Sequence, residues 1–532
     1  MTTAPERLRP PEDERPPGAG DGDGHGGAAG ATRTGPGLAR AGRVLRVLAG
    51  VGAVGFLALY VLVALRRIDH PYELEWMEGG VVDHVRRVLD GRRLYDAPSL
   101  EFTPYLYTPL YVWVSAGASA VLGVGFFPLR LVSFVASLAA FAGIHRLVRV
   151  ETGDRWAALV ATGLFAACFR LGGAWFDLAR VDTLFLALLV WGLVVARRTA
   201  RTGAGRDVVL AGVLLSLAFL AKQSALLPAL ATAVALLVRP ASRRVGAALG
   251  ATLAAGIGGS WLVLHLATGG WFTRYVFVLP EQHELVHEDW VRFWTRDLLD
   301  PLWPVLLVIA AGVVVLARST RGREQLWWYV PVLGGLVAAA WSSRLHSGGY
   351  DNVVLPAYLA VAVAVGLALH ALREAPRRVV LVPLAGLLVV GQFVGLRYDV
   401  GDQLPPAGAV AAGDRLVDRL RALPGPVHLP GHGWLLARAG HETGAQSAAI
   451  GDVLRGDIDD GRLREELATA IREQRFAAVV VESARGLTYL PRGFSRSYRL
   501  AYRLTGGELL LPVTGTRTQP LEVWLPRGFG EG

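Results

Sequence analysis

The sequence is poor in the charged residues and cysteines that many soluble and secreted proteins use. Charged residues make up 18% of the 532 residues, whereas about 25% is usual for a soluble domain. Cysteine occurs once, as Cys168 within an apolar run, which excludes a disulfide framework and a cysteine metal cluster. Lysine also occurs once, as Lys222. Because all the other residues counted as Lys or Arg are arginines, Lys222 stands out as a candidate functional residue.

Long apolar runs take the place of the missing charges. Hydrophobic residues make up 52% of the sequence, and the mean hydropathy is +0.39. A helix needs about 20 apolar residues to cross the hydrocarbon core of a bilayer, and about eleven runs come near that length. The sequence therefore predicts an α-helical polytopic membrane protein. The expected spans are 44–65, 129–147, 156–172, 182–196, 207–221, 223–238, 245–267, 301–317, 326–341, 353–370 and 379–396.

The net charge of +10 does not indicate a nucleic-acid partner, because the arginines cluster in short segments between apolar runs. These segments alternate with others that hold His, Glu, Asp and Trp. Arginine-rich loops between membrane spans face the cytoplasm. We therefore expect membrane lipid and no nucleic acid as partners. We also expect a multi-pass chain in the inner (plasma) membrane with a cytoplasmic N-terminus. The arginine-rich segments are 146–155, 197–206, 239–244, 318–323 and 373–378.

One further apolar stretch, 105–124, tests this topology. If it crossed the membrane, the arginine-rich loops that follow it would face outside. We therefore predict an interfacial or re-entrant helix here, with its Tyr and Trp side chains at the headgroup boundary. It belongs to a large first outer loop, 67–128.

The composition changes twice along the chain. Residues 1–40 are rich in Pro, Gly, Asp and Arg, which predicts a disordered cytoplasmic tail. Residues 41–399 hold the apolar runs and form the expected transmembrane domain. From residue 400 to residue 532 the composition is that of a soluble domain, and we expect a small extracytoplasmic α/β domain there.

Short patterns predict the elements of this last domain. The segments 427–430 and 476–483 have the apolar character of buried strands, and 461–475 has helical periodicity. The run 500–513 predicts a β-hairpin. Histidines in this domain, such as His432, are expected to be structural more often than functional.

The first outer loop contains two carboxylates that are candidates for acid–base chemistry. Glu75 and Glu78 are three residues apart, so on a helix they share a face. A carboxylate here can deprotonate an acceptor hydroxyl if it lies within hydrogen-bond reach. The alternative is a solvated acidic segment at the start of the loop.

Basic residues at the predicted outer ends of two spans suit a phosphate. Arg180 lies two residues before Asp182, and its guanidinium has the fork geometry that phosphate accepts. Lys222 ends another span and is a compact phosphate partner. A local ion pair is the alternative for Arg180, and snorkelling to the interface is the alternative for Lys222.

A third polar segment, 344–352, lies at another predicted outer edge. It contains paired glycines, which permit close backbone approach. The side chains of Arg344, His346, Tyr350 and Asn352 suit a phosphate or a sugar. A plain polar turn explains the same pattern.

The segment 283–287 matches the H-E-x-x-H pattern of zinc enzymes. On a helix it places His283 and His287 on one face as metal ligands. Positions 290 and 293 are Trp and Phe, so the extended pattern of one zinc-protease group fails. A metalloprotease is therefore the weakest alternative, and a divalent metal stays open as a cofactor.

Taken in order, these motifs resemble the GT-C glycosyltransferases, in particular the bacterial relatives of protein mannosyltransferases and aminoarabinose transferases. The resemblance covers roughly 44–400. It rests on an acidic motif in the first loop, a Pro-Leu-Tyr segment at 109–111, an Arg-Leu pair at 130–131, the Arg-x-Asp element at 180–182, a helix ending in Lys222, and the segment 349–356.

The resemblance implies a reaction. A sugar passes from a polyprenyl-phosphate donor to an acceptor hydroxyl on the outer face, with envelope glycan, lipid or protein as acceptor. Glu78 fits the position of the general base, because the pair Glu78–Gly79 mirrors the family pattern. The usual Asp-Glu pair is here Met77–Glu78, which leaves open that Glu75 substitutes. Lys222, Arg180 and Arg344 would neutralise the lipid phosphate, with Asp182, His346, Tyr350 and Asn352 near the substrate.

Two alternatives without transferase activity stay open. A transporter concentrates ionisable groups near the bilayer midplane and often contains repeats, whereas the groups here gather at one predicted face. A scaffold protein for envelope assembly needs no acidic loop beside Arg and Lys at matching depth.

Overall fold

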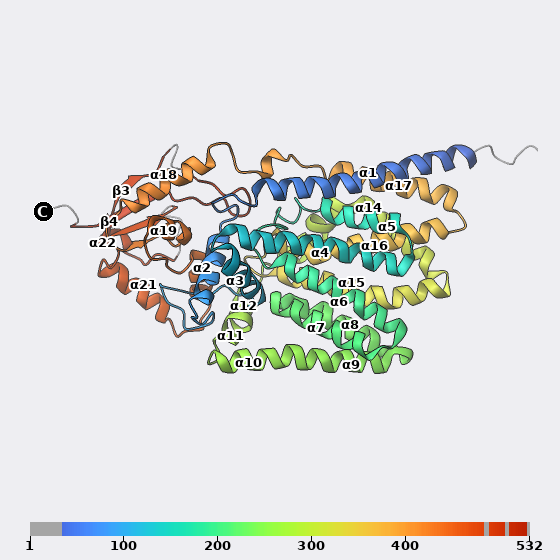
Figure 1. The fold of residues 1–532 in the computed structure, drawn as a ribbon, viewed down its shortest axis with the longest axis horizontal. Coiled ribbons are helices and arrows are strands. Elements are labelled where there is room, and N and C mark those ends of the chain that lie inside the picture. Colours follow the sequence, from blue (N-terminus) through green and yellow to red (C-terminus); the bar gives the residue numbers. More distant parts are fainter. Residues whose placement is uncertain (1–34, 483–488, 506–509, 529–532) are drawn as a thin grey trace, which may run out of the picture.

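The computed structural model describes residues 35–482, 489–505 and 510–528, and it consists of a helix bundle with a small α/β unit at one end (Figure 1). The predicted fold class is thus confirmed. In the described ranges, seven helical stretches are long and apolar enough to cross a membrane. They are Gly37–Arg67, Phe126–Thr152, Asp182–Thr202, Pro240–Ala267, Asp289–Ala317, Asp351–Glu374 and Arg378–Gly395.

Each predicted span falls on a helix of the bundle. Four of these helices, α5, α7, α8 and α15, are not among the seven stretches, so the total of about eleven spans stays a prediction. The bundle helices are α1 (Gly35–Arg67), α4 (Phe126–Thr152), α5 (Arg155–Ala167), α6 (Asp182–Thr202), α7 (Gly205–Ala221), α8 (Leu226–Val238), α9 (Arg243–Leu253), α10 (Gly259–Ala267), α14 (Asp300–Ala317), α15 (Thr320–Leu345), α16 (Leu355–Glu374) and α17 (Arg378–Gly395). The predicted tail, 1–40, lies outside the described residues except for 35–40, which begin α1.

Small residues and aromatic rings hold the bundle together. A side chain at Gly163 of α5 would lie 2.4 Å from the Cα of Ala53 on α1, so these two helices approach at backbone distance. Close approach through small residues is how membrane helices gain packing contacts. The hydroxyl of Tyr60 on α1 bonds to Ser137 on α4, and the ring of Tyr60 lies edge-on to Phe141.

Short elements cap the end of the bundle that carries the α/β unit (Figure 1). The first loop contributes α2 (Glu78–Leu89) and α3 (Leu110–Leu122). Helix α3 has 13 residues and is about 20 Å long, which is too short to span a bilayer. The expectation that 105–124 does not cross the membrane agrees with this length. Other short segments are α11 (Trp271–Thr273), α12 (Leu279–Gln282), α13 (Asp289–Arg292) and the π-helical turns Ala254–Gly258, Arg274–Val278 and Phe293–Leu299.

The α/β unit is a four-stranded mixed sheet with helices packed on it. Its strands are β1 (Val427–His428), β2 (Ala478–Val481), β3 (Tyr498–Arg503) and β4 (Glu522–Pro526), in the order β1-β2-β4-β3. The pair β1–β2 is parallel and needs a crossover, which three helices provide. The helices of the unit are α18 (Ala409–Arg421), α19 (Gly433–Ala439), α20 (Ser447–Arg455), α21 (Arg462–Arg472) and α22 (Phe494–Ser497).

The predicted strands and helix of this unit are present, but the described residues of 500–513 do not pair with one another as the predicted hairpin; residues 506–509 lie outside the described ranges. Strand β3 pairs in antiparallel register with β4, and Tyr498 lies opposite Pro526. The apolar residues 510–513 instead turn back toward the first loop, where the N–H of Val513 donates to the carbonyl of Leu74 at 2.9 Å. Residues 500–503 and 510–513 both have β propensity. Their partners, β4 and the first loop, lie elsewhere in the sequence, so local propensity did not predict the pairing.

Candidate active site

A cavity of about 670 Å³ lies where the bundle, the first loop and the α/β unit meet. The first loop supplies Tyr105 and Tyr107, and the bundle supplies Arg180 and Lys222. The α/β unit supplies polar groups that include Asp452, Arg455 and Tyr489. The cavity therefore brings together residues more than 350 positions apart in the sequence.

Glu78 is fully buried, and all of its lone pairs have partners nearby. Arg130 of α4 donates to both oxygens, at 3.0 Å from Nε to Oε1 and 2.6 Å from Nη2 to Oε2. The backbone N–H groups of Leu74 and Ala179 donate to the same carboxylate at 2.7 and 2.8 Å. Burial disfavours the charge, but Arg130 and these hydrogen bonds outweigh it and hold the pKa of Glu78 below its usual range. A carboxylate bound in this way is poorly suited to accept a proton.

Glu75 is equally buried but only half satisfied. Its Oε2 lies 3.4 Å from Nη1 of Arg180 and accepts from the N–H of Met77 at 3.2 Å. Its Oε1 has no partner among the described residues. Burial raises the pKa of Glu75 to about 8, against the opposing effect of Arg180. A carboxyl group that titrates near neutrality has the protonation behaviour expected of an acid–base group.

Glu75 and Glu78 do not lie on one helix, so their spacing does not place them on a shared helix face. Helix α2 begins at Glu78, where an acidic residue is favoured by the helix dipole, and Glu75 precedes it in a turn. The N–H of Glu78 donates to the carbonyl of Glu75 at 3.0 Å, which fixes the turn. The two side chains therefore point to different basic partners, Arg130 and Arg180.

Lys222 and Asp182 form a buried ion pair beside the cavity. The Nζ atom of Lys222 lies 2.6 Å from Oδ1 of Asp182. The side-chain amide of Asn352, at the start of a 3₁₀ turn (Asp351–Val354), donates to both oxygens of Asp182 at 3.1 Å. Lys222, Asn352 and Arg180 all line the cavity. The helices α6 and α7 thus hold two cations at one wall, and Asp182 positions one of them.

Arg344 is placed differently from the other two predicted phosphate ligands. Its guanidinium binds Asp297 through two nitrogens, at 2.9 and 3.2 Å, and donates to the carbonyl of Gly349 at 2.6 Å. It does not line the cavity, whereas His346 and Tyr350 of the same segment do. Arg344 therefore holds the 344–352 loop in place, and its direct contact with phosphate stays a prediction.

The H-E-x-x-H segment does not form the helix that a zinc site of this type needs. Helix α12 ends at Gln282, and Leu285 forms an isolated bridge with His346. In the described part of the chain, no group of three or more His, Cys, Asp or Glu side chains is arranged to hold a metal ion. His283 lines the cavity and lies 3.9 Å from Asp452, whereas His287 does not line it. The arrangement removes the geometric basis for the metalloprotease alternative.

The pairings of two groups in this region were not predicted from the sequence. Arg130, which belongs to the Arg-Leu motif at 130–131, forms the buried pair with Glu78. Glu73 forms a 2.5 Å contact with His432, which ties the first loop to the α/β unit. Both partnerships join distant segments, so local spacing gave no signal for them.

Comparisons with known proteins agree with this architecture. The sequence profile of the dolichyl-phosphate-mannose-protein mannosyltransferase family matches residues 104–265. A search of curated proteins gives no significant match. Among solved structures, the chain is similar to ArnT from Cupriavidus metallidurans bound to undecaprenyl phosphate, with 12% identity, a TM-score of 0.57, and coverage of 88% of this chain and 97% of ArnT. The apo structure of the same ArnT gives 13% identity and a TM-score of 0.56 over the same shares.

At this level of identity the likeness to ArnT establishes the fold. The matched profile covers α3 to most of α10 and includes Arg180, Asp182 and Lys222. The chain thus has the ArnT fold of a multi-pass membrane protein, and the profile match over 104–265 agrees with the expected glycosyltransferase class.

Proposed function

We propose that the chain transfers a sugar from a polyprenyl-phosphate donor to an acceptor hydroxyl, within the cavity between the bundle and the α/β unit. The observation that carries the proposal is the placement of Arg180. This side chain lines the cavity and also lies 3.4 Å from the half-satisfied carboxyl of Glu75, which is buried next to the lining residue Trp76 and does not itself line the cavity. An acid–base group and a phosphate-binding cation are thus in contact. The ArnT structure with undecaprenyl phosphate supports a polyprenyl carrier as the donor lipid.

The proposed roles follow from charge and position. Lys222 and Arg180 bind the donor phosphate, and Asp182 with Asn352 orients Lys222. Glu75 in its ionised form accepts the proton of the acceptor hydroxyl. The acceptor oxygen bonds to the anomeric carbon while the bond from that carbon to the phosphate oxygen breaks. Polyprenyl phosphate leaves with its charge stabilised by the two cations, and this stabilisation lowers the barrier. A single displacement inverts the anomeric centre.

This proposal assigns the base to Glu75 rather than Glu78. Both were candidates, and the family pattern favoured Glu78. The low pKa and four hydrogen bonds of Glu78 fit a structural role, in which it anchors the first loop to α4 through Arg130. His346 and Tyr350 remain proposed contacts for the sugar, because they line the same cavity.

The orientation is also part of the proposal. Helix α1 leads from the far end of the bundle to the first loop and the α/β unit (Figure 1). The arginine-rich segments connect helices at the far end, which the positive-inside rule places in the cytoplasm. The cavity and the α/β unit then face the outside of the plasma membrane, where an envelope glycan, lipid or protein supplies the hydroxyl.

The test is transfer by the purified full chain in detergent. The donors are a panel of radiolabelled polyprenyl-phosphate sugars, and the acceptor is an extract of the cell envelope. We expect transfer or donor hydrolysis from at least one donor. Glu324→Gln alters an exposed glutamate at the far end of the bundle. It serves as the matched control for Glu75→Gln and should keep full activity. Folded protein that consumes no donor contradicts the proposal.

Parallel assays with EDTA test the predicted involvement of a divalent metal.

A further inference from the structure

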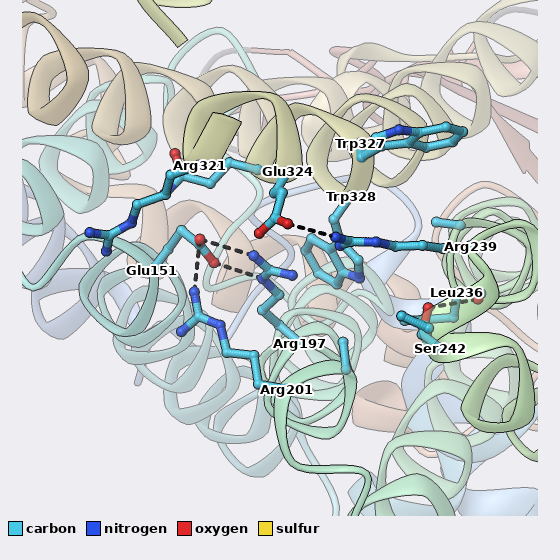
Figure 2. A pocket seen from close by; sticks show the side chains of 14 residues that line it. Glu151, Arg197, Arg201, Leu236, Arg239, Ser242, Arg321, Glu324, Trp327 and Trp328 are labelled. Atoms are coloured by element: carbon cyan, nitrogen blue, oxygen red, sulfur yellow. Dashed lines mark hydrogen bonds and ion pairs between the residues drawn. The ribbon is translucent and has the colours of Figure 1, made fainter. Parts of the chain in front are cut away.

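A second cavity, of about 490 Å³, lies at the end of the bundle away from the α/β unit. Helix α4 starts beside the first loop and runs for 27 residues, so Glu151 near its C-terminus marks the far end. The C-terminal turns of α6 and α8 and the first turns of α15 complete the wall (Figure 2). We call this the arginine cavity.

The arginine cavity contains more positive than negative charge. Its charged lining residues are Arg197, Arg201, Arg239 and Arg321, with Glu151 and Glu324. Four arginines therefore face two glutamates. A cavity with this excess attracts an anion.

One part of the lining is a fixed scaffold. Arg197 is buried and donates to both oxygens of Glu151, at 2.7 and 3.0 Å. Arg201 reaches the same carboxylate at 2.8 Å (Figure 2). Two guanidinium groups thus share one carboxylate, which leaves donor capacity on Arg201 beyond this contact.

Other arginines of the lining are free or weakly held. Arg239 pairs with Glu324 at 3.0 Å, but both side chains are substantially exposed, and such pairs are weak. The side chain of Arg321 makes no hydrogen bond or ion pair with any residue in the described ranges, and Figure 2 draws no contact from it. These two side chains can turn to an anion without breaking a buried contact.

A buried donor in the same wall lacks an acceptor. The indole nitrogen of Trp328 is buried and has no hydrogen-bond partner in the described part of the chain. The Trp328 side chain lines the cavity and lies under the guanidinium of Arg197, 5.3 Å from its ring centroid. A buried donor without an acceptor costs about 1–3 kcal/mol. An oxygen atom of a bound anion would satisfy it.

The surroundings indicate a membrane lipid as the source of that anion. Trp327, on the same wall, is 55% exposed, and Leu237 and Val238 at the end of α8 are 43% and 54% exposed. Tryptophan is favoured at the headgroup level of a bilayer. Exposed apolar side chains beside a basic cavity suit the acyl chains of a lipid whose phosphate enters the cavity. Basic pockets between membrane helices on the cytoplasmic side bind anionic head groups.

We propose that the arginine cavity binds the phosphate of an anionic phospholipid head group, with Arg239, Arg321 and Trp328 as its added contacts. The site is separate from the candidate active site and does not depend on the proposed transfer. Its ligand chemistry is a phosphate group, which a lipid or free phosphate can present.

Binding is measured with the purified full chain in an uncharged detergent, by titration with phosphatidylglycerol, phosphatidylcholine or inorganic phosphate. We expect saturable binding of phosphatidylglycerol at least tenfold tighter than binding of phosphatidylcholine. Equal affinity for the two lipids overturns the proposal. Binding of inorganic phosphate as tight as that of phosphatidylglycerol overturns the lipid as the ligand.

Variants separate this site from general surface attraction. The double variant Arg239→Gln/Arg321→Gln should weaken phosphatidylglycerol binding about tenfold or more, since each basic side chain near an anionic lipid contributes about fivefold. Arg243→Gln/Arg244→Gln removes the same charge from exposed residues that do not line the cavity, and should change the affinity less than twofold. An equal loss in both double variants overturns the site.

The unpaired indole gives an independent test that keeps the charge constant. Trp328→Phe removes the N–H while keeping an aromatic ring. It should weaken phosphatidylglycerol binding about tenfold or more, as expected for loss of one hydrogen bond to a charged group, with no loss of thermal stability. Unchanged affinity in a folded Trp328→Phe protein contradicts the assigned contact.

Discussion

The two ends of the bundle treat buried acidic groups differently. At the far end, Glu151 is surrounded by Arg197 and Arg201 and also accepts from Tyr329 at 3.2 Å. At the end beside the α/β unit, Glu78 is equally well paired. The nearby Glu75 has one carboxylate oxygen without a hydrogen-bond partner among the described residues, and its one basic partner, Arg180, lies 3.4 Å from the other oxygen. All three carboxylates are buried.

The difference separates groups that hold the structure from a group that is free to react. A buried charge without full pairing destabilises the folded state. Such a group is retained where its reactivity is used, and its perturbed pKa marks a candidate active site. The contacts of Glu78 and Glu151 are those of structural anchors, whereas Glu75 is the group that we propose as the base.

Removal of a structural anchor should have the largest effect on stability. Arg130→Leu leaves Glu78 buried without its basic partner, and loss of one member of a buried pair costs about 3–5 kcal/mol. We expect a strong decrease in folded protein and in the midpoint of thermal unfolding. Arg239→Leu, which breaks the exposed pair with Glu324, is the control and should change stability by less than about 1 kcal/mol. Equal behaviour of the two variants would remove the distinction drawn between the carboxylates.

Two basic residues that line the cavity, Lys222 and Arg180, should control donor binding. Lys222→Met removes a charged contact to the donor phosphate, and a hydrogen bond to a charged group is worth about 1.5–3 kcal/mol. We expect the apparent affinity for the donor to fall roughly 10- to 100-fold, measured as KM for the labelled donor. The double variant Lys222→Met/Asp182→Asn avoids an unpaired buried carboxylate and should show the same loss. Normal donor affinity in the folded double variant would exclude Lys222 as a phosphate ligand.

The pH dependence of transfer should report the ionisation of Glu75. Because its pKa is raised to about 8 and the ionised form is the base, the transfer rate should rise up to about tenfold per pH unit below 8 and level off above it. The measurement is kcat/KM for the donor between pH 5.5 and about 9.5. A profile that is flat from about pH 6 upward would point to a base with an ordinary carboxyl pKa.

The same raised pKa predicts a smaller effect on stability. The folded state keeps the proton on Glu75 up to about pH 8, whereas the unfolded chain loses it near pH 4.3. The folded state therefore binds more protons between these values, and stability from this group falls as the pH rises through that window. Glu75→Gln should show a shallower decrease in its thermal midpoint over this range than the wild-type chain.

Much of the fold could be predicted from the sequence, because bundle helices follow from the length of apolar runs. The acidic first loop, Arg180 and Lys222 were also found from residue type and position. The roles of Glu75 and Glu78 could not be separated in this way, because their partners Arg180 and Arg130 are 105 and 52 residues away. The ion pair of Arg344 could not be predicted for the same reason, since its partner Asp297 lies 47 residues earlier.

The α/β unit shows the same limit. Its strands and the helix at 461–475 had clear local patterns, but the described residues of the predicted hairpin do not pair with one another, because residues 510–513 contact the first loop instead of β3. The contribution of Asp452, Arg455 and Tyr489 to the cavity depends on how this unit docks on the bundle. Docking of two parts leaves no periodic signal in either segment.

The most direct test compares Glu75→Gln with Glu78→Gln in the same transfer assay, as a single-turnover rate per folded molecule with saturating donor. Loss of a general base costs about 10²- to 10⁴-fold in rate. We predict this loss for Glu75→Gln with an unchanged thermal midpoint below about pH 4, where the carboxyl is largely protonated in the folded and the unfolded chain. For Glu78→Gln we predict a lower thermal midpoint with a rate within about tenfold of wild type. A folded Glu75→Gln protein with full activity, or a loss of chemistry confined to Glu78→Gln, would contradict the assignment of Glu75 as the base.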